Sequence, residues 1–272
     1  MKKKNKNCFN GLTAVNVELS SKCNKNCWMC GRRKIDKEYP EIAIDYGFMK
    51  FNLVKKIAEQ VPTDIVIQFH NNGEPLLYPR FGDAVSLFEK QIRTMDTNGK
   101  LIVEKADEII DNLDTMTVSV IEKDPDGDDQ YELVKQFLDI KGKRKPNLIY
   151  RCLGDVEHID RWKKLPGIFC TRILHSPLGS FNYTKNPTIP EIGICLEILN
   201  KMVIDRFGMV SICVRFDPKR IGVIGDANKT TLIDIWKSKK RKEWIKYHIM
   251  GRRDKIPLCS YCEFWGVPTG YK

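Results

Sequence analysis

The stretch Cys23-Asn-Lys-Asn-Cys27-Trp-Met-Cys30 places three cysteines within eight residues. It comes shortly after residues 14–19, an apolar run whose valines favour a strand. Three thiolates are one fewer than the four cysteines that usually hold a four-iron cluster, so one iron would stay open to a ligand that is not protein. Zinc is the alternative, because structural zinc sites use four ligands at C-x2–4-C spacing. The stretch therefore predicts a metal centre.

The composition is that of a globular protein with reduced cysteines. The chain has 272 residues, 42% of them hydrophobic, which suffices for one large domain or a large and a small one. No apolar run is long enough for a transmembrane helix, and the basic residues 1–6 are not followed by the apolar segment of a signal peptide. Ten cysteines without an export signal predict a cytoplasmic protein whose cysteines bind metal.

The net charge of +11 is concentrated in residues 237–255, which hold nine Lys and Arg against Glu243 and Asp254. Such a run could contact a phosphorylated substrate or nucleic acid. A solvated helix face is the commoner explanation, and no nucleic-acid-binding motif accompanies the run. We therefore expect no nucleic-acid partner and no membrane partner. A zinc-stabilised nucleic-acid-binding protein is the alternative from a different functional class.

Strands and helices alternate through the first two thirds of the chain. The pattern predicts parallel βα units with right-handed crossovers, whose chemistry lies at the carboxyl ends of the strands. The cysteine stretch follows the first strand and should lie at that end. The predicted strands are residues 14–19, 64–70, 92–96, 115–121, 148–153 and 167–174, and the helices are residues 48–61, 81–91, 102–113, 130–140 and 156–164.

The alternation stops after Leu174. Residues 176–190 are rich in Pro, Gly, Asn and Ser and predict an irregular connector. Residues 202–205 and 209–214 flank Arg206-Phe-Gly208 and predict a hairpin, and residues 232–239 and 242–250 predict two helices. These changes place a domain boundary near residue 185, between domains of residues 1–185 and 186–272.

A second set of cysteines lies in the smaller region: Cys195, Cys213, Cys259 and Cys262. Four thiolates can satisfy a [4Fe–4S] cluster completely. They can also hold tetrahedral zinc, and Cys259-Ser-Tyr-Cys262 has the spacing of a zinc knuckle. The spacing alone does not decide between the two.

The CxxxCxxC loop after a first strand resembles the signature of the radical S-adenosylmethionine (SAM) superfamily. The C-terminal stretches 208–213, 221–226 and 232–236, with the terminal CxxC, resemble its SPASM/Twitch subgroup. The resemblance implies an α/β fold, with a partial (β/α)6 TIM-like barrel and a small C-terminal α+β Twitch domain. The layout is similar to that of a dehydrogenase of this family that acts on an aminocyclitol.

The resemblance also implies the cofactors. Cys23, Cys27 and Cys30 would hold a [4Fe–4S] cluster whose open iron is chelated by the amino and carboxylate groups of SAM. In this family the reduced cluster passes one electron to SAM, and cleavage yields a 5′-deoxyadenosyl radical. The four C-terminal cysteines would hold a second, auxiliary [4Fe–4S] cluster, as in the shorter Twitch arrangement.

Residues 71–75, Asn-Asn-Gly-Glu-Pro, look like the family's GGEP motif, with Asn72 in place of the first glycine. By this resemblance Glu74 and nearby backbone carbonyls would receive the ammonium group of SAM. Thr97 and Asn98 after the third strand, and Ser119 on the fourth, occupy positions that contact SAM in the family. The expected cofactor-binding residues are Trp28, Asn72, Gly73, Glu74, Pro75, Thr97, Asn98 and Ser119.

Four further residues are candidates for the chemistry on the substrate. Arg172 takes the place of a substrate-contacting arginine in the family, but arginine stays protonated, so it is better suited to anchoring the substrate. His175 has the more suitable pKa for a general base. Cys152 and Cys170 end the fifth and sixth strands, where a thiol could return a hydrogen atom to a substrate radical and give epimerisation.

These observations predict a radical SAM oxidoreductase that acts on a small polyol, aminocyclitol or sugar. The auxiliary cluster would accept an electron from the substrate, and a flavodoxin or ferredoxin would act as the one-electron reductant. The alternatives within the family are an epimerase and a maturase of ribosomal peptides. The sequence leaves open the substrate and the choice between oxidation and epimerisation.

Overall fold

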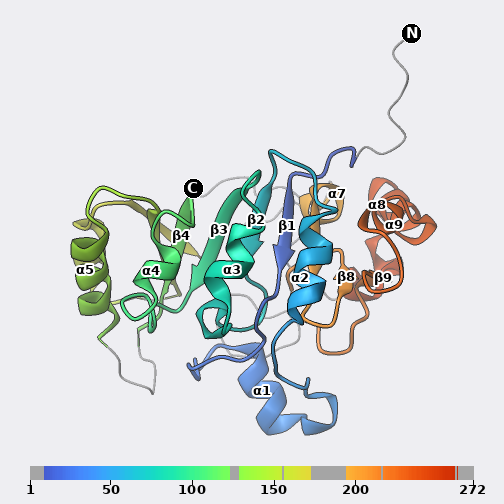
Figure 1. Cartoon of the computed structure of the whole chain (residues 1–272). Helices are drawn as coiled ribbons and strands as arrows, with labels where there is room; N and C mark the ends of the chain where they lie inside the picture. The colour runs from blue at the N-terminus through green and yellow to red at the C-terminus, as the bar shows by residue number, and fades with distance from the viewer. Residues whose placement is uncertain are drawn as a thin grey trace.

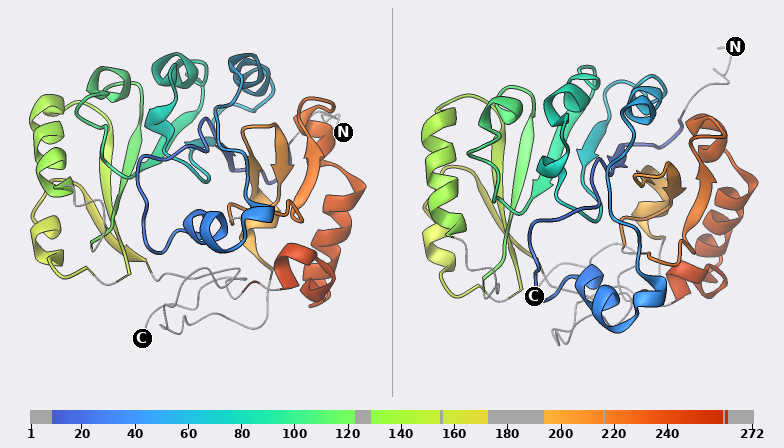
Figure 2. Two further views of the ribbon diagram at one scale, coloured as in Figure 1. Left: turned by 90° about the horizontal axis from the view of Figure 1, so that it is seen from below. Right: turned by 60° about the horizontal axis from the view of Figure 1, so that its bottom comes forward.

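The computed structural model describes residues 9–122, 129–154, 156–172, 194–215, 217–260 and 262. Within these residues a nine-stranded sheet has the order β6-β5-β4-β3-β2-β1-β7-β8-β9. Figures 1 and 2 show the sheet as an open arc with helices along its outer side. The first six strands are neighbours in parallel, and they are β1 (Ala14–Val17), β2 (Val66–Phe69), β3 (Ile92–Thr97), β4 (Thr115–Val120), β5 (Asn147–Leu153) and β6 (Ile168–Arg172).

The core lies between the arc of strands and the outer helices. Leu53, Val54 and Ile57 share one face of α2 and are buried, as the apolar spacing predicts. Phe69 on β2 meets the rings of Phe81 and Phe88 edge-on, at centroid distances of 6.3 and 5.4 Å. The helices of this part are α1 (Gly31–Glu38), α2 (Phe51–Ala58), α3 (Phe81–Ser86), α4 (Ala106–Ile109), α5 (Gln130–Lys141) and α6 (Ile159–Lys163), with 3-10 turns η1 (Pro40–Ile42) and η2 (Pro75–Leu77).

The predicted α/β class and the parallel strands are confirmed, but several helices are shorter than predicted. The largest difference is at residues 102–113, where only α4 is helical. Asp111 adopts φ of +61°, a left-handed conformation that ends a helix. Ile102, Ile109 and Leu113 are still fully buried. The apolar pattern of residues 102–113 therefore predicted the buried residues correctly but overestimated the length of the helix.

The C-terminal strands continue the same sheet. β7 (Lys201–Ile204) pairs in parallel with β1, and β8 (Met209–Ser211) returns antiparallel to it, which confirms the predicted hairpin. The sequence analysis missed β9 (Val223–Asp226), which pairs with β8. The predicted boundary at residue 185 lies outside the described residues and stays a prediction. The remaining elements are α7 (Leu196–Asn200), α8 (Leu232–Trp236), α9 (Lys239–Ile249), η3 (Arg253–Lys255) and α10 (Pro257–Ser260).

The basic run of residues 237–255 is partly structural. Arg241 on α9 is buried, with its guanidinium 3.2 Å from the ring centroid of Trp236. It donates hydrogen bonds to the carbonyls of Ile198 and Leu199 and so holds α9 against α7. This part of the run is not available to a ligand. Among the described helices, none has the length and apolar character needed to cross a membrane.

Candidate active site and auxiliary cluster site

The structure brings the three N-terminal cysteines to one cavity. Cys23, Cys27 and Cys30 lie in the loop between β1 and α1, and Cys30 is the residue that caps the N-terminus of α1. The cavity has a volume of about 310 Å³, and all three cysteines line it. In Figure 2 the blue helix α1 lies across the opening of the arc of strands. The cysteine loop is therefore at the carboxyl ends of the strands, as predicted.

The donor set of this loop fits an iron–sulfur cluster better than a single ion. Across the described residues, no three His, Cys, Asp or Glu side chains are placed to hold one metal ion together. Zinc needs its ligands about 2.0–2.3 Å from one point, whereas a four-iron cube distributes its thiolates over separate irons. Burial raises the pKa of Cys23, so cluster binding must displace a thiol proton there. Three thiols spread around a cavity have the arrangement that a cube requires.

Glu74 fastens the loops around this cavity to one another. Its side chain is 2% exposed. One carboxylate oxygen accepts hydrogen bonds from Leu76 N and Thr97 Oγ1, and the other accepts one from Asn98 N. Burial raises its pKa to about 7 in spite of these bonds. Because a carboxylate has about four acceptor positions, Glu74 has room for one further donor.

The loops after β1, β2 and β3 touch one another at the cavity. Glu74 N donates to Lys22 O at 2.8 Å, which ties the loop after β2 to the cysteine loop. Asn98 Nδ2 donates to Asn24 Oδ1 at 2.8 Å and lies 3.7 Å from Cys23 Sγ. Gly73 is packed against the backbone of residues 20–22, where a Cβ atom would lie 2.2 Å from Ser20 O. Only glycine therefore fits at this contact.

The expected cofactor-binding residues do not all reach the cavity. Those that line it are Asn72, Gly73, Glu74, Thr97, Asn98 and Ser119. Pro75 begins η2 and is buried beside the cavity wall. Trp28 is 37% exposed and is not part of the lining.

Of the candidates for substrate chemistry, some line the cavity and others do not. Arg172 at the end of β6 lines the cavity, and desolvation by the cavity wall, followed by the charges of Arg151 and Arg215, lowers its pKa. Cys152 is fully buried in the hydrophobic core, where burial raises its pKa to about 11. Neither Cys152 nor Cys170 lines the cavity. His175 lies outside the described residues.

A row of polar side chains crosses the inside of the arc and was missed by the sequence analysis. Asn16 Nδ2 donates to Gln68 Oε1 at 3.2 Å, and Gln68 Nε2 donates to Asp96 Oδ1 at 3.0 Å. Asp96 Oδ2 accepts from Arg151 Nη1 at 2.5 Å. His70 and Asp96 line the cavity together with Arg172. Polar residues inside otherwise apolar strands were the sequence signal that could have revealed this row.

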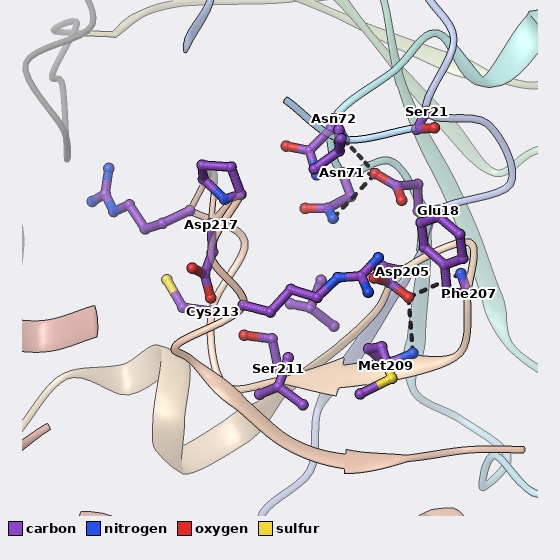
Figure 3. Close-up of a pocket in the computed structure, with 16 residues that line it drawn as sticks. Glu18, Ser21, Asn71, Asn72, Asp205, Phe207, Met209, Ser211, Cys213 and Asp217 are labelled. Atoms are coloured by element: carbon purple, nitrogen blue, oxygen red, sulfur yellow. Dashed lines mark hydrogen bonds and ion pairs between the residues drawn. The ribbon is translucent and has the colours of Figure 1, made fainter. Parts of the chain in front are cut away.

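A second group of polar side chains joins the loop after β2 to the C-terminal strands (Figure 3). Glu18 is 2% exposed and lies just after β1. Its Oε1 accepts from Asn71 Nδ2, Asn72 N and Asn72 Nδ2 at 3.0–3.2 Å, and its Oε2 accepts from Arg206 N at 3.0 Å. The cavity of about 50 Å³ beside it is also lined by Cys213. Glu18 therefore fixes the loop after β2 to the β7–β8 turn.

Glu18 should make stability depend on pH. Burial raises its pKa from 4.5 to about 7, so between these values the folded chain binds a proton that the unfolded chain has lost. The free energy of unfolding should therefore fall as pH rises through this window, by on the order of 3 kcal/mol. Urea unfolding of the cluster-free, reduced protein at several pH values measures the slope.

Glu74 titrates in the same window, so Glu18→Gln should remove roughly half of this pH dependence. Glutamine imitates the protonated carboxyl and has no charge to desolvate. An unchanged slope in the variant would show that Glu18 is not the titrating group.

The four C-terminal cysteines lie around a separate site. Cys195, Cys213, Cys259 and Cys262 all line a cavity of about 20 Å³. Arg253 Nη1 donates to Cys259 O at 2.9 Å and to Cys262 O at 2.7 Å, which fixes the CxxC turn. Burial raises the pKa of Cys259 to about 12 and also raises that of Cys213.

His248 on α9 lines the same small cavity and was also missed by the sequence analysis. Both of its ring nitrogens are buried and have no hydrogen-bond partner among the described residues. Sulfur atoms of a bound cluster would supply the missing acceptor. Four thiols with an unpaired imidazole beside them fit a completely ligated [4Fe–4S] cluster.

Comparison with known proteins agrees with both sites. The SPASM family, described as an iron–sulfur cluster-binding domain, matches residues 195–263. The S-adenosyl-L-methionine-dependent 2-deoxy-scyllo-inosamine dehydrogenase of Niallia circulans is 24% identical over 266 residues, which cover 94% of each chain. The chain has the layout of a radical SAM enzyme of the SPASM/Twitch subgroup. The matched SPASM segment contains all four cysteines of the second site.

Solved structures of other proteins have the same fold as this chain. BtrN in complex with AdoMet and 2-DOIA has a TM-score of 0.68 at 22% identity, covering 95% of both chains. Native anSMEcpe with bound AdoMet has a TM-score of 0.66 at 16% identity, covering 87% of this chain and 84% of that one. The predicted partial barrel with a C-terminal Twitch domain agrees with these neighbours.

Proposed function

We propose that this protein is a radical SAM dehydrogenase that oxidises a hydroxyl-bearing carbon of a small polyol, aminocyclitol or sugar. When bound, the cluster and SAM supply the removal of a hydrogen atom from a carbon–hydrogen bond. The observation that carries the proposal is the pairing of two cysteine sites. A three-thiol cavity can hold SAM, and a four-thiol site can hold an electron acceptor.

The residues of the chain have separate roles in this proposal. Cys23, Cys27 and Cys30 hold the catalytic cluster, and Glu74 with Asn98 shapes the SAM side of the cavity. Arg172 anchors the substrate at the end of β6.

The four C-terminal cysteines hold the auxiliary cluster. Glu18 connects the C-terminal strands to the loop after β2 through its hydrogen bonds with Arg206 N and Asn72 N. A small cytoplasmic electron carrier, such as a flavodoxin or ferredoxin, would reduce the catalytic cluster.

The position of the remaining cysteines favours oxidation over epimerisation. A thiol that returns a hydrogen atom must reach the substrate radical. Cys152 is buried among apolar side chains on the core side of β5, and Cys170 does not line the cavity. Dehydrogenation needs no such thiol, because no hydrogen atom is returned to the substrate carbon.

The test is an anaerobic assay of the reconstituted protein with SAM, dithionite and 2-deoxy-scyllo-inosamine, the compound named in the relative's description. We expect about eight iron atoms per chain and 5′-deoxyadenosine formation that depends on the substrate. The product should be a ketone formed at the carbon that loses its hydrogen, so this carbon carries no deuterium when the reaction is run in heavy water. A redox-neutral product carrying solvent deuterium would contradict the proposal in favour of an epimerase. If neither this compound nor related polyols and sugars raise deoxyadenosine formation, the proposed substrate class is wrong.

A further inference from the structure

His70 is a histidine in the wall of the large cavity, with one unpaired ring nitrogen. It directly follows β2, and its carbonyl accepts a hydrogen bond from Asn16 Nδ2 at 3.1 Å. The residue as a whole is half-buried and lines the cavity. Its Nδ1 is buried and has no hydrogen-bond partner among the described residues. An unsatisfied buried nitrogen costs about 1–3 kcal/mol, so the imidazole is held in the cavity wall at an energetic cost.

The charges around His70 leave its ring neutral. Desolvation is the main cause that lowers its pKa, and Arg151 and Arg172 lower it further, while the carboxylate of Asp96 acts in the opposite direction. A neutral imidazole carries one nitrogen that can accept a proton. Asp96 is 6% exposed, and burial raises its pKa, but interaction with His70 and then with Arg151 lowers the pKa below its usual value. An ionised carboxylate is therefore in place to stabilise an imidazolium.

The other groups at the cavity are less suited to taking a proton. Desolvation and neighbouring cations lower the pKa of Arg172, but arginine is effectively always protonated in proteins and is a poor base. Asp96 is already engaged by Arg151 and Gln68. Glu74 is enclosed by three donors from its own chain. Among the described residues that line the cavity, His70 is the neutral base.

We propose that His70 is the general base that accepts the hydroxyl proton of the substrate. This inference rests on the proposed dehydrogenase function. Oxidation of a secondary alcohol to a ketone removes a hydrogen atom from carbon, a proton from oxygen and one electron. The hydrogen atom leaves with the deoxyadenosyl group of SAM, and the electron goes to the auxiliary [4Fe–4S] cluster. The proton goes to His70, whose ring becomes an imidazolium facing Asp96.

The test compares His70→Asn and His70→Gln with the wild-type holoenzyme. Both amides can hydrogen-bond like imidazole but cannot take a proton at neutral pH. We expect iron content and SAM affinity, measured without reductant, to be unchanged. The rate of ketone formation from 2-deoxy-scyllo-inosamine should fall by about 100-fold or more, as for loss of a general base. His158→Asn is the matched control, because His158 is an exposed histidine that directly precedes the outer helix α6.

Two readouts separate a base from a merely structural residue. The wild-type rate should decline at acidic pH as His70 becomes protonated, and this decline should be absent in both variants. In the cluster-free protein, 15N spectra of the four histidines should show one ring whose signal shifts when 2-deoxy-scyllo-inosamine is added. That signal should be missing in His70→Asn.

Different outcomes would contradict the role of His70 and the dehydrogenase function. A wild-type enzyme that forms ketone, with variants that keep its rate and its acidic decline, would overturn the role of His70 alone. A ring signal that does not respond to saturating substrate would do the same. If the wild-type enzyme neither binds nor oxidises any alcohol tested, the dehydrogenase function fails, and the assignment of His70 fails with it.

Discussion

Replacing Cys27 by alanine is expected to abolish SAM cleavage and to remove about four of eight iron atoms per chain. Among the described residues, Cys23, Cys27 and Cys30 are the cysteines that line the cavity of about 310 Å³, so none of the other described thiols is in place to replace Cys27. Loss of an outer partner of a metal ligand already costs 10–100-fold in affinity or activity, so loss of the ligand itself should exceed about 100-fold. Iron analysis and deoxyadenosine formation under reducing conditions measure both effects.

Cys259→Ala is the matched control, because it removes one thiolate of the other site. This variant should also lose about four iron atoms, but it should still cleave SAM. Ketone should not accumulate, since the proposed electron acceptor is gone. A Cys27→Ala protein that retains SAM cleavage, or two variants with the same profile, would contradict the division of the cysteines into a catalytic and an auxiliary set.

The cysteine loop could be predicted from sequence because its geometry is local. Three cysteines within eight residues after a strand must lie near one another at the strand's carboxyl end, whatever the rest of the chain does. The GGEP-like turn was predicted on the same basis. Its order in the chain, after the second strand, determines its place in a parallel sheet.

The residues that were missed come together only through the sheet. Asn16, Gln68, Asp96 and Arg151 lie on four different strands, and only Asn16 and Gln68 are single polar residues in an apolar strand. A polar residue within one strand can indicate a special position, but it does not show which side chains on other strands it meets. Their row exists because the strands curve into an arc and their side chains alternate between its two faces.

In the C-terminal region, too, the local sequence does not predict which strands pair. β9 contains Gly225 and follows Gly222, so its sequence has little of the composition of a strand. The strand forms because it pairs with β8, and Gly225 allows close packing against Ile235. Likewise, the parallel pairing of β7 with β1 joins residues nearly two hundred positions apart. Such pairings depend on the whole fold and not on local pattern.

Gly73→Ala is expected to disrupt the SAM site with the smallest possible side chain. A Cβ at Gly73 would lie 2.2 Å from Ser20 O, 2.6 Å from Lys22 O and 2.7 Å from Ser21 C. These are backbone atoms, so no rotamer change can relieve the overlap. Overpacking typically costs 1–3 kcal/mol, and a backbone overlap should reach at least the upper end, about 3 kcal/mol. The cysteine loop must move away from the loop that carries Glu74.

The variant should therefore reconstitute with less iron and bind SAM at least about 100-fold more weakly, if the strain falls on the SAM-bound state. Equilibrium dialysis of SAM without reductant measures the affinity. Gly82→Ala is the matched control, because its Cβ would meet Glu108 Cγ at an ordinary 3.4 Å. Since Gly82 lies within α3, alanine there should preserve SAM binding and add roughly 0.5–1 kcal/mol of stability. Wild-type SAM affinity and iron content in Gly73→Ala would show that the two loops need not touch for the cofactor to bind.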